Sequence, residues 1–250
     1  MDILLCQEYE EFGNISYILQ SQYGIGVHFA KFSSKIACAD QYGGDGIATL
    51  FKTSKFEMLE KFSSTVADMT LLQAKTNPKQ LILVANMHLK GPPFNQTEQL
   101  FQAMFVMHQI NDKLQQLEKK YESKIELLIG GDLNCVPESL SRNFFAGNFE
   151  KALSIFDDDE KQTIASSLKD LKTLDAFEDK HCSTNYTEEF TGSIDHMFYD
   201  STAFVPHIIS QVSTDDLMRV SDGQFDKLPN IGFLSDHVPI LAAFKRVQKT

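Results

Sequence analysis

The chain has 250 residues, 42% of them hydrophobic and 23% charged, which is the composition of a folded globular protein rather than a disordered or fibrous one. Its 34 acidic and 23 basic residues give a formal net charge of −11, which argues against non-specific coating of nucleic acid, because that binding depends on many Lys and Arg contacts to phosphates. No apolar run approaches the roughly 20 residues of a membrane span, so we expect no membrane partner.

Short apolar runs with the length of β-strands follow one another along the chain. They are Ile3–Cys6, Gly46–Phe51, Leu81–Leu89, Ile125–Ile129, Ile194–Tyr199 and Val238–Phe244. Residues 81–85 are continuously apolar, which is typical of a strand covered on both faces, as in a sheet that packs against another layer.

A long amphipathic helix is predicted from about Asn95 to Tyr121. Leucine and methionine residues recur there at helical spacing, while Gln, Glu and Lys fill the opposite face. Asn95 or Thr97 can cap its start, because the side-chain oxygens of these residue types accept hydrogen bonds from the free N–H groups of the first turn.

Two shorter helices are predicted further along the chain. One begins after Pro137, has Glu138 in its first turn and ends near Gly147. The stretch Phe156–Leu171 is predicted to be a loop that leads into a short helix. Its acidic run at 157–160 lacks the spaced ligands and the glycine of a calcium loop, so it indicates a solvated helix N-terminus.

Polar side chains that suit phosphoester chemistry stand where the predicted strands end. They are Glu8, Asn86, His88, Asp132, Asn134, Asp195, His196, Asp236 and His237. Side chains at strand ends can converge on one rim of a sheet sandwich, where loops carry function. Glu, Asp and Asn oxygens suit Mg²⁺ or Mn²⁺, and nearby histidines can move protons or hold a phosphoryl oxygen. The combination is typical of a metal-assisted phosphoester hydrolase.

Each of these residues also has a purely structural interpretation when it is taken alone. A single His at a strand end is usually satisfied locally, and the turn at residues 130–134 could be an ordinary one in which Asp and Asn bond their own backbone. The recurrence of such elements at successive strand ends is hard to obtain by chance, and it favours a functional site.

The motifs resemble those of the endonuclease/exonuclease/phosphatase superfamily, the group that includes DNase I. Its signatures occur in the family's order as Leu5-Cys6-Gln7-Glu8, Asn86-Met87-His88-Leu89, Gly131-Asp132-Leu133-Asn134, Ser193-Ile194-Asp195-His196 and Ser235-Asp236-His237. Residues 45–52, 184–192 and 228–230 resemble the deadenylase branch, with nocturnin and Angel. The resemblance implies an α/β protein, a four-layer α/β/β/α sandwich of two mixed sheets, formed as a single domain over residues 1–250.

The resemblance also implies roles for single residues. Glu8 and Asp236 are similar to the family's metal-site carboxylates, with Mg²⁺ or Mn²⁺ as cofactor. His88 is similar to the histidine that contacts the scissile phosphate. Asp132 is similar to the aspartate that orients or activates the attacking water, with Asn134 as its companion.

Further implied roles concern the catalytic pair and the substrate. Asp195 is similar to the aspartate that orients the catalytic histidine, here His237. Phe190 and Pro92 match the aromatic residue and the proline that sandwich the terminal adenine, and Asn86 is assigned to substrate binding. For Phe190, plain packing in the core is the competing interpretation.

The chain departs from the family at its start. Family members have a first strand with a metal-site asparagine, and then a helix, before the strand that carries Glu8; here Met1 stands at the onset of that second strand. We expect the domain to lack the first strand and helix and to expose an apolar edge. An incomplete gene product, a natural short paralogue with weakened metal binding and a non-catalytic descendant all explain this. His196, where the family usually has an aromatic residue, is expected to be a neutral replacement.

The leading functional prediction is an Mg²⁺-dependent phosphodiesterase, a 3′-to-5′ exoribonuclease that acts on the poly(A) 3′ end of RNA. The alternatives are a phosphatase or phosphodiesterase for a small nucleotide, as in nocturnin-like relatives, and an inactive scaffold of an RNA-decay complex. The lack of the first strand favours the scaffold, whereas the complete Asp and His set favours the enzyme. Four widely spaced cysteines predict a reducing compartment, the cytoplasm first and the nucleus second.

Overall fold

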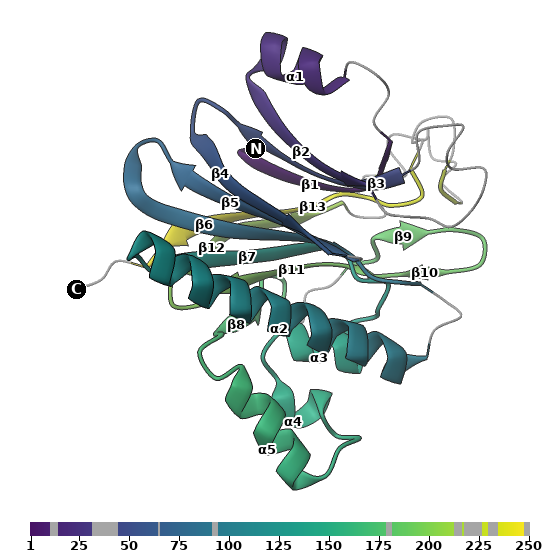
Figure 1. The fold of residues 1–250 in the computed structure, drawn as a ribbon. Coiled ribbons are helices and arrows are strands. Elements are labelled where there is room, and N and C mark those ends of the chain that lie inside the picture. Colours follow the sequence, from purple (N-terminus) through teal and green to yellow (C-terminus); the bar gives the residue numbers. More distant parts are fainter. Residues whose placement is uncertain are drawn as a thin grey trace. The chain divides into compact units, whose positions relative to one another are not determined.

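The computed structural model describes residues 1–10, 15–31, 45–64, 66–91, 95–178, 182–212, 217, 227–229 and 235–247. Two compact units make up the chain. Unit 1 comprises Met1–Lys90 and Met104–Asp132, and unit 2 comprises Gly91–Ala103 and Leu133–Thr250. Figure 1 labels the helices and strands of both units. That residues 1–250 act as one domain stays a prediction.

Unit 1 is built on β-strands that form two sets. The strands are β1 (Ile3–Glu10), β2 (Ile25–Lys31), β3 (Asp45–Lys52), β4 (Phe56–Ser63), β5 (Ala67–Ala74), β6 (Asn77–His88) and β7 (Ile125–Asp132). One set is the antiparallel sheet β1-β3-β2, with helix α1 (Ile15–Tyr23) between β1 and β2 in the chain. The other follows the order β4-β5-β6-β7, antiparallel except for the parallel pair β6–β7, so it is mixed.

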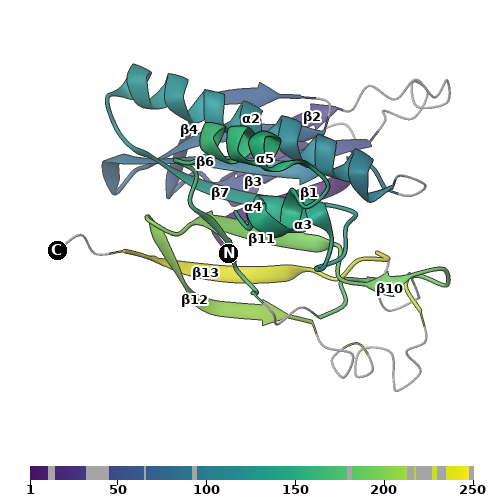
Figure 2. The ribbon, with the colours of Figure 1, turned by 90° about the horizontal axis from the view of Figure 1, so that it is seen from below.

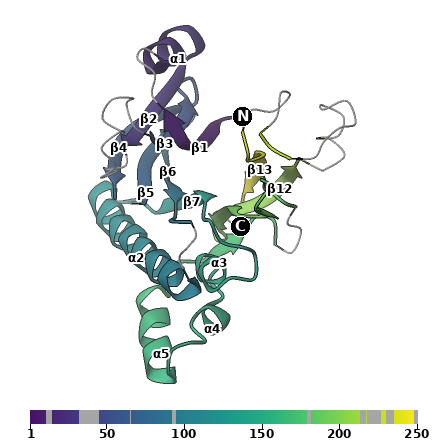
Figure 3. The same ribbon diagram turned by 90° about the vertical axis from the view of Figure 1, so that its right-hand side faces the viewer.

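The core of unit 1 lies around strands β5, β6 and β7. Strands β5 and β7 are buried almost without interruption, and β6 is buried from Leu81 to Met87, which includes the continuously apolar run at 81–85, as predicted for a strand covered on both faces. In Figure 3 these strands lie between the sheet β1-β3-β2 and helix α2 (Gln96–Tyr121), which contributes its residues from Met104 onward to unit 1. Two layers therefore cover the central strands.

Helix α2 confirms the predicted helix at 95–121. Its apolar face is buried at Leu100, Met107 and Leu117. The Asn95 side chain accepts a hydrogen bond from the backbone N–H of Glu98 at 3.0 Å, so Asn95 is the capping residue.

Three short helices of unit 2 follow β7. They are α3 (Leu140–Phe145), α4 (Phe149–Ala152) and α5 (Asp158–Ser167). Helix α3 starts later than predicted because Ser139 caps it by accepting from the N–H of Arg142, which leaves Pro137 and Glu138 outside the helix. Helix α5 begins after a capping box between Asp157 and Glu160, as the acidic run indicated.

The strands of unit 2 are short and antiparallel. They are β8 (Thr173–Asp175), β9 (Asn185–Tyr186), β10 (Thr191–Gly192), β11 (Asp195–Asp200), β12 (Phe204–Gln211) and β13 (Ile240–Arg246). The pairs are β11 with β8, β10 with β9, and β12 with β13. Figure 2 shows the β12–β13 pair alongside β11. The Phe244 ring joins them, because its centroid lies 5.3 Å from that of Tyr199 and 5.8 Å from that of Phe204.

The elements together make an α/β protein with mixed sheets, in agreement with the predicted class. Strand β1 is an edge strand of its sheet, and Ile3, Leu4 and Leu5 on it are half-buried. The expected absence of a family strand and helix before β1 stays a prediction. No helix in the described part of the chain is long and apolar enough to cross a membrane.

Candidate active site

Glu8 stands at an irregularity of strand β1. The register between β1 and β3 shifts between Cys6 and Tyr9, and Glu8 itself has a φ of 49°. This left-handed region is uncommon for a residue other than glycine. A bulge bends a strand and re-aims its side chains, and the Glu8 side chain is 69% exposed. The backbone of β1 thus presents this carboxylate to the solvent.

His88 lies between two carboxylates of unit 1. Its Nε2 atom is 4.0 Å from Oε1 of Glu8 and 3.6 Å from Oδ2 of Asp132. His88 and Asp132 are register partners at the ends of the parallel strands β6 and β7, which explains why they meet. Asp132 is nearly buried. The structure therefore brings together three of the predicted site residues from distant parts of the sequence.

Gly131 makes the close approach of β6 and β7 beside Asp132 feasible. Its φ is 139°, and a Cβ atom there would lie 2.0 Å from the backbone oxygen of Met87. Only glycine fits this conformation and this contact. The N–H of Leu89 also donates to the Asp132 carbonyl at 3.0 Å. The glycine before Asp132 thus serves the geometry of the strand end.

Asn86 is fully buried inside unit 1 and uses its amide within the protein. Its Nδ2 donates to the carbonyls of Cys6 at 3.3 Å and Ala48 at 3.0 Å, and its Oδ1 accepts from Gln7 Nε2 at 2.7 Å. These contacts tie β6 to β1 and β3 next to Glu8. Substrate binding by Asn86 stays a prediction, and the contacts observed are those of a residue that holds two sheets together.

Asp195 and His237 form a hydrogen-bonded pair in unit 2. Oδ2 of Asp195 lies 2.8 Å from Nδ1 of His237, and both side chains are partly exposed. A carboxylate at this position fixes the proton on Nδ1, so the imidazole offers Nε2 for proton transfer. The pairing predicted from the sequence is thus present in the geometry, while its catalytic role stays a prediction.

Thr184 positions both members of this pair, although it was not among the site residues predicted from the sequence. Its Oγ1 accepts from the N–H of Ile194 at 3.0 Å and from the N–H of Asp195 at 3.1 Å, while its carbonyl accepts from Val238 N–H at 2.7 Å. Thr184 is fully buried. The sequence did contain a hint of its importance, because Thr184 is the first residue of the segment 184–192 that resembles the deadenylases.

The remaining predicted residues of unit 2 are placed as follows. Asn134 follows β7 with a left-handed φ of 49°. Asp236 is half-buried, and its carbonyl accepts from the N–H of Tyr186 at 3.1 Å. Phe190 is 40% exposed, which speaks against the core interpretation of this ring. Pro92 lies outside the described residues. His196 is fully buried.

The carboxylates of unit 1 fit a hard cation. Mg²⁺ keeps several waters and usually takes one or two protein carboxylates, so it needs no closed cage. Glu8 and Asp132 flank the same imidazole nitrogen, and the Glu8 side chain is open to solvent. Within the described residues, no group of three or more His, Cys, Asp or Glu side chains is placed to hold a metal ion. Glu8 and Asp132 could supply the one or two carboxylates that a water-rich magnesium ion takes, and its binding stays a prediction.

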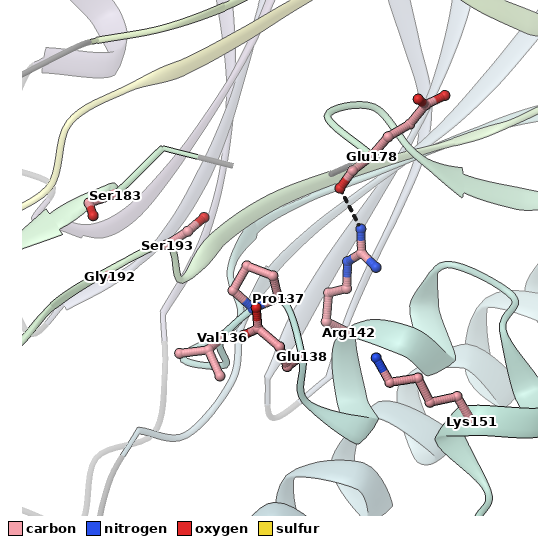
Figure 4. A pocket seen from close by; sticks show the side chains of 9 residues that line it. All are labelled: Val136, Pro137, Glu138, Arg142, Lys151, Glu178, Ser183, Gly192 and Ser193. Carbon is pink, nitrogen blue, oxygen red and sulfur yellow. Dashed lines mark hydrogen bonds between the residues drawn. The ribbon is translucent and has the colours of Figure 1, made fainter. Parts of the chain in front are cut away.

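Unit 2 also contains a pocket of about 490 Å³. It is lined by Val136, Pro137, Glu138, Arg142, Lys151, Glu178, Ser183, Gly192 and Ser193. Figure 4 shows Arg142 donating to the backbone oxygen of Glu178, at 2.9 Å, and the same guanidinium pairs with buried Asp175 at 2.8 Å. Lys151, Glu138 and Glu178 add one positive and two negative charges, so the pocket has no excess of positive charge with which to select an anion.

Curated relatives match most of the chain. No protein-family profile matches it. The CCR4-Not complex 3′-5′-exoribonuclease subunit Ccr4 of Schizosaccharomyces pombe is 29% identical over 279 residues, covering 90% of this chain and 39% of that protein. The probable Ccr4 subunit of Vairimorpha ceranae is 27% identical, covering 98% of this chain and 55% of that protein. The chain thus spans about half the length of these relatives, or less.

Solved structures share the fold. The human nocturnin catalytic domain with bound sulfate has a TM-score of 0.66 at 19% identity, with 98% of this chain and 81% of that chain covered. ANGEL2, a 2′,3′-cyclic phosphatase, in complex with adenosine-2′,3′-vanadate has a TM-score of 0.67 at 20% identity, with 97% and 81% covered. The resemblance read from the motifs is confirmed: the chain is similar across most of its length to the Ccr4 exoribonuclease subunits, and it shares the endonuclease/exonuclease/phosphatase fold of nocturnin and ANGEL2.

Proposed function

We propose that the chain is an Mg²⁺-dependent phosphodiester hydrolase that removes adenosines from the 3′ end of RNA. The observation that carries the proposal is the grouping of Glu8, His88 and Asp132 at strand ends of unit 1. The hydrogen-bonded pair of Asp195 and His237 in unit 2 supports it. Both groups belong to motifs that resemble those of one superfamily, so we propose that they serve one reaction.

Each predicted site residue would have its own role in hydrolysis of the phosphodiester. Hydrolysis forms a bond from water oxygen to phosphorus and breaks the bond from phosphorus to O3′ of the preceding nucleotide. One proton leaves the water and one reaches the departing O3′, giving a nucleoside 5′-monophosphate and a shortened RNA. Asp132 would orient the water and His88 would hold a phosphoryl oxygen. Asp195 keeps the proton of His237 on Nδ1, so Nε2 is free to exchange a proton with the reacting groups.

Glu8, with Asp132 beside it, would hold the metal ion in unit 1, and Asp236 is the proposed metal-site carboxylate of unit 2. When bound, Mg²⁺ would neutralise charge on the phosphoryl oxygens and on the leaving group. Removal of the metal with EDTA should abolish hydrolysis, and Mg²⁺ or Mn²⁺ should restore it.

The preference for adenosine rests on Phe190. Its ring is 40% exposed, and its backbone is held by a turn in which Phe190 N–H donates to Thr187 Oγ1 at 3.0 Å. An exposed ring on a fixed turn suits stacking on a base. The chain is acidic overall, so stacking supplies binding energy that phosphate contacts would otherwise provide.

The deciding experiment follows 5′-labelled oligoadenylate with Mg²⁺, with oligocytidylate of equal length as comparison and the His237→Ala variant as control. Stepwise shortening of oligoadenylate, lost in the variant, is the expected result. Cleavage of a 2′,3′-cyclic mononucleotide or a small nucleotide phosphate without shortening of RNA would instead make the chain a nucleotide phosphatase. A folded protein that cleaves none of these substrates would be a scaffold.

The relatives also support proposals about partners, cellular location and fold. The matched Ccr4 proteins are described as CCR4-Not complex subunits, so we propose RNA-decay proteins as partners and the cytoplasm as the main location. The fold likeness supports the four-layer α/β/β/α sandwich as the arrangement of the whole chain.

A further inference from the structure

Two consecutive backbone carbonyls after β7 each receive a hydrogen bond from a distant side chain. Gln99 Nε2 donates to the Asn134 carbonyl at 2.7 Å, across 35 residues of sequence. The His196 ring nitrogen Nε2 lies 2.7 Å from the Cys135 carbonyl, across 61 residues. A carbonyl oxygen only accepts, so Nε2 of His196 carries the proton. Both contacts lie within unit 2.

These bonds act on a segment whose backbone is not regular. Asn134 has a φ of 49°, in the left-handed region that asparagine adopts more readily than other residues with a side chain. Gln99 is 7% exposed and His196 is fully buried, so water cannot readily replace either donor. The two side chains thus hold the backbone after β7 in place, one from helix α2 and the other from strand β11.

The side chain of Asn134 is confined from a third direction. A Cβ atom placed on Gly91 would lie 2.8 Å from Asn134 Oδ1, so the amide packs against glycine backbone where no other residue fits without displacing it. Two successive carbonyls of this loop are therefore held by side chains from α2 and β11, and the Asn134 side-chain oxygen lies close to Gly91.

We propose that Gln99 and His196 are positioning residues, which set the orientation of the Asn134 amide that acts at the phosphate. This inference rests on the proposed function, which places Asn134 at the reacting group. The His196 side chain contributes a proton as well as a ring, since an aromatic hydrocarbon at this position could fill the space but could not donate to the Cys135 carbonyl.

The test compares variants that keep or remove each donor. His196→Gln retains an N–H donor at the ε position, whereas His196→Phe keeps a ring of similar size without one. Gln99→Met removes the donor with little change of shape. On oligoadenylate, His196→Phe and Gln99→Met should lower kcat on the order of 10- to 100-fold with a smaller change in KM, and His196→Gln should recover most of it.

A double variant separates positioning from general support of the fold. Adding His196→Phe to Asn134→Ala should cost little beyond Asn134→Ala alone, because the residue through which His196 acts is already gone. Multiplicative losses in the double variant, or equal kcat for His196→Phe and His196→Gln, would overturn the proposal. Melting temperatures show which variants are folded, and Gln99→Met carries the test should His196→Phe not fold.

A measurement without substrate keeps this inference distinct from the proposed function. Selective ¹⁵N labelling of asparagine, with Asn134→Ala to assign the signal, reports the Asn134 side-chain amide directly. That signal should shift or broaden in His196→Phe and Gln99→Met and return in His196→Gln. An unchanged Asn134 signal would refute positioning. A responsive signal in a protein that cleaves no substrate would refute the function while leaving the positioning intact.

Discussion

Thr184→Val, compared with Thr184→Ser, examines how unit 2 holds its catalytic pair. Valine has nearly the shape of threonine but no oxygen, so the N–H groups of Ile194 and Asp195 lose the acceptor that now lies at 3.0 and 3.1 Å. A buried N–H left unsatisfied costs about 1–3 kcal/mol. Ile194 is buried, whereas Asp195 is partly exposed and water can relieve part of its cost. The expected loss is about 2–3 kcal/mol of the free energy of unfolding.

Thr184→Ser keeps the oxygen and removes one methyl group, so its cost should stay near 1 kcal/mol. The valine variant should melt roughly 5–10 °C below the wild type and remain folded at 25 °C. Hydrolysis should fall more in valine than in serine, because Asp195 is the partner of His237. Urea unfolding at 25 °C measures the free energy of unfolding of both variants, and hydrolysis is measured in parallel. Equal stability of the two variants would show that the two hydrogen bonds contribute nothing and would refute this account of the pair.

Four further predictions concern single groups. Glu8→Gln should raise the Mg²⁺ concentration needed for half-maximal hydrolysis without lowering the melting temperature, since the side chain is 69% exposed; wild-type activity at every Mg²⁺ concentration would show that Glu8 is no ligand. Asp195→Asn and His237→Ala should each cost much the same activity, and the double variant little more, because the pair acts as a unit; additive losses would contradict the pairing. Phe190→Ala should lose about 1–3 kcal/mol of transition-state binding for oligoadenylate and little for a phosphodiester without a base; a large fall in melting temperature with equal losses on both substrates would return the ring to the core. Burial raises the pKa of the Cys6 thiol to about 11, so its alkylation in the native protein should be negligible at pH 8 and should rise only as the pH approaches that value, whereas fast modification at pH 7 would contradict the burial.

Elements with strong local signals were predictable from the sequence. The helix at 96–121 repeats its apolar period over many turns and starts at a good capping residue, Asn95, so the prediction agrees with it to one residue. The continuously apolar run at 81–85 marked the central strand for the same reason. The missed strands include β4, which is largely exposed and rich in charge, and β12, which carries Pro206 and mostly exposed residues instead of an apolar run. Strand β5 was missed although it is buried, because Asp68 and Thr70 interrupt its apolar residues.

The residues of the candidate site also differ in how far the sequence predicted them. Motifs revealed the chemistry-bearing residues Glu8, His88 and Asp132, and the parallel register of β6 and β7 brings two of them together as strand ends suggested. The supporting residues had no comparable local signal. The irregularity at Glu8 depends on a backbone angle, and the two hydrogen bonds accepted by Thr184 depend on partners about ten residues away. No local pattern of residue types specifies either feature.

The buried amide of Asn86 has a consequence for how activity fails on heating. It donates to the main-chain carbonyls of Cys6 and Ala48 and accepts from the Gln7 side chain, so a buried side-chain amide sets the distance between the strand that carries Glu8 and the strand that carries His88. On heating, this distance between the two strands should not change gradually as surface side chains become more mobile. The unit 1 part of the site should therefore keep its geometry up to the cooperative melting of its sheets and lose it in that same transition, not in a local loosening that precedes it.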